Sequence, residues 1–168
     1  MKAHTRILGV GSPFGDDRLA WVAVDSIRAS AWYRSRAQGA VFAESFDRPG
    51  PALLAAMDGA AHAVLIDAIQ SGEPPGTLQL VELEQLAWRA DTFASGHTLG
   101  VAETLLLGKA LELLPPRLTL IAVEVGRVGG GDSLSDEVRA ALPALLKCVE
   151  ACVTDEDRAL GTPAAVPG

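Results

Sequence analysis

The stretch RILGVGSPFGDDRLAWVAVDSI (residues 6–27) decides how the chain folds. An apolar run at residues 6–10 is followed by a turn rich in glycine and then by apolar residues at near-helical spacing. This order predicts a buried strand that leads through a tight turn into a helix over residues 17–32. Two neighbouring acids, Asp16 and Asp17, lie where that helix begins.

Strand-like and helix-like segments alternate along the rest of the chain, as is typical of a mainly parallel sheet with helices on its faces. We therefore predict an α/β fold, a three-layer sandwich in which a twisted, mostly parallel sheet of about five strands carries helices on both faces. The alternating segment at 77–83 predicts an antiparallel edge strand. The expected strands are residues 6–10, 41–46, 63–68, 77–83 and 118–125, and the expected helices are 17–32, 51–57, 97–114 and one that follows an N-cap at Ser135.

Length and composition predict one domain over residues 1–153 and a flexible, Pro- and Gly-rich tail over residues 154–168. The formal charge of −7, without clustered Lys or Arg, argues against a nucleic-acid partner. The first apolar run is too short for a signal sequence or a membrane span. Cys148 and Cys152 lie on one helical stripe and predict core packing in a reducing compartment rather than a disulfide. We expect a cytoplasmic protein without a membrane partner.

Three polar residues follow strands or open helices at the edge of the sheet where ligands bind in such folds. Asp17 follows the first strand, Asp67 ends the buried run at 63–68, and His97 opens the longest apolar helix. Each alone has a structural explanation, as a helix cap, a turn acceptor or a packed histidine. Together they form a set of two carboxylates and one imidazole that suits a borderline divalent metal.

Two further acids, Asp16 and Glu124, accompany this set as candidate outer partners of the metal ligands. Asp16 and Asp17 are consecutive, so their side chains point in different directions and only one is expected to face the site while the other caps a helix. Glu124 lies inside an apolar strand, where a carboxylate is either a hydrogen-bonded structural group or an outer partner of the metal ligands.

The glycine turn at residues 9–15 also resembles a dinucleotide-binding turn, with Glu44 at the end of the next strand to hold a ribose. Asp16 and Asp17 disfavour this reading, because a pyrophosphate needs a helix N-terminus without negative charge. Pro13 also removes an amide donor from the turn.

Four motifs in register then identify a family. They are GSPFGDD (11–17), VLIDA with EPPG (64–68 and 73–76), SGHTLGVAE (95–103), and VEV with LSDEV (123–125 and 134–138). In order and spacing they resemble the hydrogenase maturation endopeptidases over residues 7 to about 143. This chain lacks one residue between Gly11 and Asp16 relative to that pattern, which leaves open whether Asp16 or Asp17 faces inward.

The resemblance implies an endopeptidase that removes the C-terminal extension from a nickel-iron hydrogenase large-subunit precursor. It implies that Asp17, Asp67 and His97 engage nickel that arrives with the precursor, with zinc or cadmium able to replace it in a crystal and no organic cofactor. We expect a monomer. Two alternatives remain: a non-catalytic, nickel-dependent checkpoint or chaperone for the precursor, and a dinucleotide-binding enzyme of the Rossmann type.

Overall fold

The centre of the molecule is a five-stranded sheet with the strand order β2-β1-β3-β5-β4. The computed structural model describes residues 4–36, 39–89, 100–126 and 131–161. Four strands run parallel and β4 alone pairs antiparallel, at one edge. The predicted fold class and its antiparallel edge strand are thus confirmed. The strands are β1 (Thr5–Gly11), β2 (Val41–Asp47), β3 (His62–Ile69), β4 (Leu78–Val81) and β5 (Arg117–Glu124).

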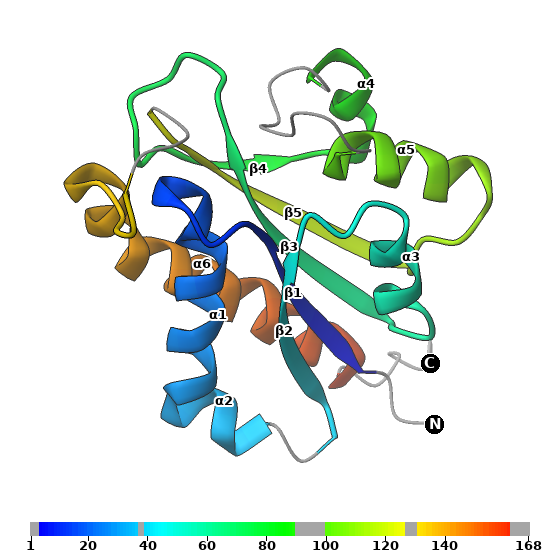
Figure 1. Cartoon of the computed structure of the whole chain (residues 1–168). Helices are drawn as coiled ribbons and strands as arrows, with labels where there is room; N and C mark the ends of the chain where they lie inside the picture. The colour runs from blue at the N-terminus through cyan, green and yellow to red at the C-terminus, as the bar shows by residue number, and fades with distance from the viewer. Residues whose placement is uncertain (1–3, 37–38, 90–99, 127–130, 162–168) are drawn as a thin grey trace, which may run out of the picture.

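Helices cover both faces of this sheet (Figure 1). The first face carries α1 (Leu19–Ala29) and the long α6 (Asp136–Gly161), and the second carries α3 (Ala52–Met57) and α5 (Val101–Ala110). Short elements complete the chain: η1 (Gly15–Arg18), α2 (Ala31–Arg36), η2 (Leu83–Gln85) and α4 (Leu86–Arg89). No helix in the described ranges is both long enough and apolar enough to span a membrane.

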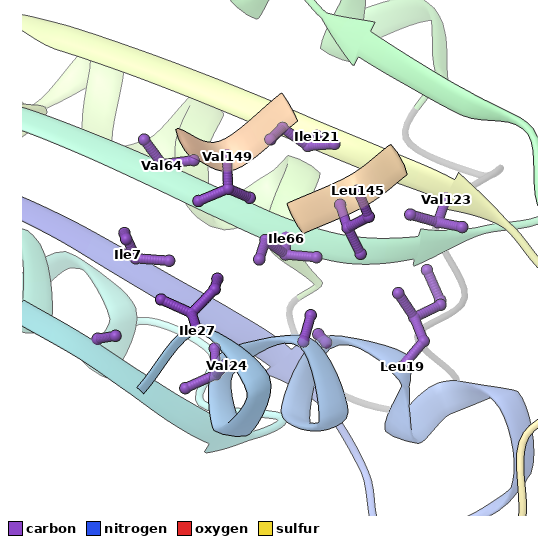
Figure 2. Close-up of a cluster of buried hydrophobic side chains, with 14 of the residues drawn as sticks. Ile7, Leu19, Val24, Ile27, Val64, Ile66, Ile121, Val123, Leu145 and Val149 are labelled. Carbon is purple, nitrogen blue, oxygen red and sulfur yellow. The ribbon is translucent and has the colours of Figure 1, made fainter. Parts of the chain in front are cut away.

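Branched aliphatic side chains fill the space between the sheet and the first helical layer (Figure 2). All eight residues of β3 are buried, which explains why its sequence is a nearly continuous apolar run rather than an alternating one. Gly9 lets α1 approach closely, because a Cβ atom there would lie 2.7 Å from the carbonyl oxygen of Ala20. The core side chains labelled in Figure 2 are Ile7, Leu19, Val24, Ile27, Val64, Ile66, Ile121, Val123, Leu145 and Val149.

The predicted helix over residues 17–32 is divided in three. A 3-10 turn, η1, precedes α1, and Ser30 separates α1 from α2 with an extended ψ of 150°. The hydroxyl of Ser30 donates to the carbonyl of Ile27 and accepts from the amide of Tyr33, so one side chain ends α1 and caps α2.

The helix predicted over residues 97–114 begins and ends inside those limits. It starts at Val101, and residues 97–99 lie outside the described part of the chain. It ends at Ala110 because Glu112 takes a positive φ of 56° and the amide of Leu113 donates to the carbonyl of Gly108. This left-handed stop precedes the two prolines that were expected to end the helix.

The C-terminal helix extends beyond the segment in which apolar residues recur at helical spacing. α6 continues to Gly161, so residues 154–161, which we expected to form part of a loose tail, are helical. Extending an existing helix costs far less than starting one, and this segment contains good helix formers. Residues 162–168 lie outside the described ranges.

Candidate active site

The sheet has a topological switch point between β1 and β3. The chain leaves β1 for β2 on one side and returns with β3 on the other, so β1 separates two consecutive strands. In open parallel sheets a crevice for ligands forms at such a point, beyond the carboxyl ends of the strands. Asp17 follows β1 within η1, and Asp67 lies two residues before the end of β3. Both predicted acids therefore flank this point.

A tight turn carries the chain from β1 into η1. The amide of Ser12 donates to the carbonyl oxygen of Asp17 at 3.2 Å, which folds the turn back onto the end of the strand. A Cβ atom on Gly11 would lie 2.1 Å from that same oxygen, so only glycine fits there. Gly15 has a φ of 50° and its amide donates to the carbonyl of Gly131. The shortened turn is thus closed by backbone bonds that fix Asp17.

Asp17 is a buried carboxylate with mixed neighbours. Its relative exposure is 8%. Burial raises the pKa of Asp17 above its ordinary value. The hydrogen bond with the Ser12 side chain and the positive charge of Arg48 lower this pKa, and the negative charge of Asp47 raises it. Burial has the largest effect, so a proton or an added cation would stabilise this carboxyl group.

Asp67 lies deeper in the protein and has fewer compensating contacts. Burial raises its pKa well above the ordinary value, and the nearby charge of Asp17 raises it further. A hydrogen bond of 2.9 Å from the amide of Ala68 to Oδ1 acts in the opposite direction. The two carboxyl groups are therefore close enough to repel each other, and a bound divalent cation would relieve both the repulsion and part of the desolvation.

His97, the third predicted ligand, lies outside the described residues. Asp67 alternates along β3 with residues of the first core, so its side chain is on the second face together with Leu65 and Ile69. α5 packs on that same face and begins four residues after position 97. Within the described ranges, no group of three or more His, Cys, Asp or Glu side chains is placed to hold a metal ion.

Asp16 has a different partner from Asp17. Its carboxylate accepts hydrogen bonds from the backbone amide of Ser135 at 2.7 Å and from the Ser135 hydroxyl at 2.9 Å. Ser135 immediately precedes α6, and its hydroxyl also accepts from the amide of Val138 at 3.4 Å. Asp16 thus joins the turn after β1 to the N-terminus of α6, whereas the charge of Asp17 acts on Asp67.

Glu124 is 2% exposed and holds the loop that follows β3. Its two oxygens accept bonds from the amides of Ser71 and Gly72 and from the Ser71 hydroxyl, at distances from 2.6 to 3.1 Å. These bonds compensate the burial of the Glu124 carboxylate within the protein.

Two residues near Asp17 were not predicted as parts of the site. Ser12 hydrogen-bonds the Asp17 side chain, and the Arg48 charge acts on it. The signal for Arg48 was available, because it directly follows β2 and the carboxyl ends of parallel strands share one edge. For Ser12, the only signal in the sequence was its position in the glycine turn.

The glycines of the turn are accounted for without a dinucleotide. Gly9 and Gly11 both adjoin backbone of the turn or of α1 that a Cβ atom would strike. Glu44, the predicted ribose ligand, lies 3.6 Å from the guanidinium of Arg6. The buried carboxyl groups of Asp16 and Asp17 occupy the place where a pyrophosphate would need positive potential.

The comparisons with known proteins identify the family of the chain. The family model described as hydrogenase maturation protease (HycI) matches residues 49–152, more than half of the chain. The chain belongs to the hydrogenase maturation protease family. Members of this family are peptidases that process the large subunit of hydrogenases, and the predicted family, activity and reaction class are confirmed at that level.

Solved structures of hydrogenase maturation proteases share the fold. The Escherichia coli hydrogenase maturating endopeptidase HybD is 24% identical over 91% of this chain and 93% of its own, with a TM-score of 0.73. HybD of Thermococcus kodakarensis is 19% identical over 89% and 99%, with a TM-score of 0.65. HycI of the same organism is 16% identical over 91% and 94%, with a TM-score of 0.64. No curated protein matches the chain.

Proposed function

We propose that this hydrogenase maturation protease removes the C-terminal extension from a nickel-loaded nickel-iron hydrogenase large-subunit precursor, and that Asp17, Asp67 and His97 engage the nickel. The observation that carries the proposal is the pair of buried carboxyl groups at the switch point, whose pKa values are both raised. Such a pair is unfavourable when both groups are ionised and no cation is near.

The metal in this proposal is part of the substrate. Two carboxylates and an imidazole are a small ligand set with open positions, and such a set holds a divalent ion weakly unless the precursor supplies the remaining ligands. Recognition of nickel would then depend on the precursor being loaded. Zinc and cadmium bind the same types of ligand, and we expect them to be able to replace nickel in a crystal. No organic cofactor enters the reaction.

The hydrolytic step requires a water molecule at the scissile carbonyl. With the ion held by the precursor and by the three side chains, the water is activated by the metal or by one of the two carboxylates acting as base. The raised pKa of Asp67 belongs to the protein before the ion arrives, because a divalent cation beside a carboxyl group lowers its pKa. We expect the enzyme to act in the cytoplasm and as a monomer.

The test uses purified protein with nickel-loaded and metal-free precursor, and mass spectrometry of the products. We expect a shortened large subunit only from the loaded precursor. Asp67→Asn and His97→Ala should abolish cleavage, whereas Asp25→Asn, which changes an exposed acid on α1, should not. Full cleavage by both site variants would refute the assignment of the site.

The alternative function, a nickel-dependent checkpoint or chaperone, predicts a different outcome for the precursor. A non-catalytic chaperone would form a nickel-dependent complex with the precursor and leave its mass unchanged. The family assignment favours the peptidase, and the mass measurement separates the two, because only hydrolysis shortens the chain.

A further inference from the structure

Arg48 lies at the same edge of the sheet as the two site carboxyl groups. It directly follows β2, whose last residue Asp47 pairs with Gly11 at the end of β1. The backbone amide of Arg48 donates to the carbonyl of Gly11 at 3.2 Å, which fixes the arginine to the turn that carries Asp17. The positive charge of Arg48 acts on Asp17 and lowers its pKa.

The backbone at Arg48 favours glycine. Its φ is 44°, in the left-handed region, and Glu112 is the only other non-glycine residue with a positive φ in the described ranges. Glu112 follows the end of α5, where a left-handed residue is a common helix terminator. Arg48 instead follows a strand and precedes Pro49, and a following proline further restricts its backbone. An arginine at this strained position therefore calls for an explanation from its side chain.

The side chain of Arg48 is only partly engaged. Its Nε atom donates to Asp47 Oδ1 at 2.9 Å, and the two side chains are 54% and 47% exposed. An ion pair this exposed contributes little to stability. Among the described residues no other side chain bonds this guanidinium, so both terminal nitrogens remain for a ligand.

We propose that Arg48 is a specificity residue that binds a carboxylate of the precursor segment next to the scissile bond. This inference rests on the proposed peptidase function. The chain carries a formal charge of −7, and Asp17, Asp47 and Asp67 gather near this edge. These acids would repel a carboxylate of the precursor, and the guanidinium of Arg48 beside them would offset that repulsion. A guanidinium offers parallel N–H groups that match both oxygens of one carboxylate.

A purely electrostatic role is the competing explanation. Arg48 could serve only to moderate the charges of Asp17 and Asp47, and a lysine would then serve nearly as well. Binding of a carboxylate by two parallel bonds is different, because a lysine keeps the charge and loses the fork. The Arg48→Lys variant therefore separates the two roles.

The experiment compares wild type, Arg48→Gly and Arg48→Lys on nickel-loaded precursor, with Arg117→Gln as a control at the opposite, exposed end of the sheet. For Arg48→Gly we expect a KM at least tenfold higher and a Tm that is unchanged or higher, because glycine relieves the strained φ. Arg48→Lys should also raise KM severalfold. A merely structural role would lower Tm and leave KM unchanged.

The carboxylate that Arg48 is proposed to bind is identified by substitutions in the precursor. Acids near the scissile bond are changed to the amide one at a time, and one change should raise KM for wild type at least fivefold and have no effect on Arg48→Gly. The inference is overturned if Arg48→Gly keeps the wild-type KM, or if no acid change is specific to the wild type. If wild-type protein cleaves no loaded precursor, the peptidase function itself fails, which is a separate result.

Discussion

Replacement of Asp67 by asparagine is expected to stabilise the protein at neutral pH and to abolish cleavage. Asparagine is nearly the same size, and its Oδ1 atom can still accept the bond from the amide of Ala68. The substitution removes only the ability to ionise. Because burial raises the pKa of Asp67 well above 3.8, ionisation of the wild-type group opposes folding.

The sign of the pH dependence follows from proton linkage. The folded state keeps the Asp67 proton at pH values where the unfolded chain has lost it, so the folded state binds more protons. The stability that the protonated group contributes is complete below the unfolded pKa of 3.8 and is lost as pH rises through the raised folded pKa. Within that window the slope approaches about 1.4 kcal/mol per pH unit.

The assay is thermal unfolding between pH 4 and 8. For a domain of this size 1 kcal/mol shifts Tm by roughly 2–4 °C, so within that window the wild-type Tm should fall by about 3–6 °C per pH unit more steeply than that of Asp67→Asn. Asp25→Asn should parallel the wild type, since that acid is exposed on α1. Parallel curves for Asp67→Asn and wild type would refute the reasoning, as would a cleavage rate that the variant retains.

Three further changes test contacts of β1, of the turn after β1 and along α6. Ser135→Ala removes the cap of α6 and a partner of the buried Asp16 carboxylate, so urea denaturation should show a loss of about 1–3 kcal/mol; a loss under about 0.5 would contradict this. Gly9→Ala places a Cβ atom 2.7 Å from a backbone oxygen of α1 and should cost about 1–3 kcal/mol by the same measurement, and an unchanged midpoint would show that α1 can move. Cys148 has a pKa lowered to about 7 by its hydrogen bond with Cys152, so iodoacetamide should alkylate Cys148 at pH 7 severalfold faster in wild type than in Cys152→Ala; equal rates would exclude that bond.

Most of the fold follows from local pattern in the sequence. The buried run at 63–68 and the alternating run at 77–83 predicted a central and an edge strand, because a strand covered on both faces is apolar throughout and an edge strand is not. Helix limits were less predictable. The breaks at Ser30 and Glu112 depend on single hydrogen bonds and one left-handed residue, which apolar periodicity does not register.

The site was predictable as far as parallel strands share an edge. That rule brought Asp17 and Asp67 to one place although they are far apart in the chain. It did not distinguish Asp16 from Asp17, because the choice depends on how the shortened turn meets Ser135, a residue more than a hundred positions away. The same rule places Arg48 at this edge, because it directly follows β2, but the effect of Arg48 on the pKa of Asp17 depends on the pairing of β1 with β2, which local sequence pattern does not reveal.

The arrangement of charges in the site is consistent with the proposed metal that arrives with the substrate. Asp16 and Glu124 are fully engaged with amides and hydroxyls, so their burial is compensated within the protein. Asp17 and Asp67 are compensated only in part, and their pKa values are raised. In a protein with its own tightly bound ion, the burial and repulsion of these two carboxyl groups would already be compensated, and the precursor would have no charge imbalance to relieve. If nickel arrives with the precursor, as proposed, it would relieve this imbalance and make binding conditional on loading, because the gain in free energy would exist only when the cation arrives.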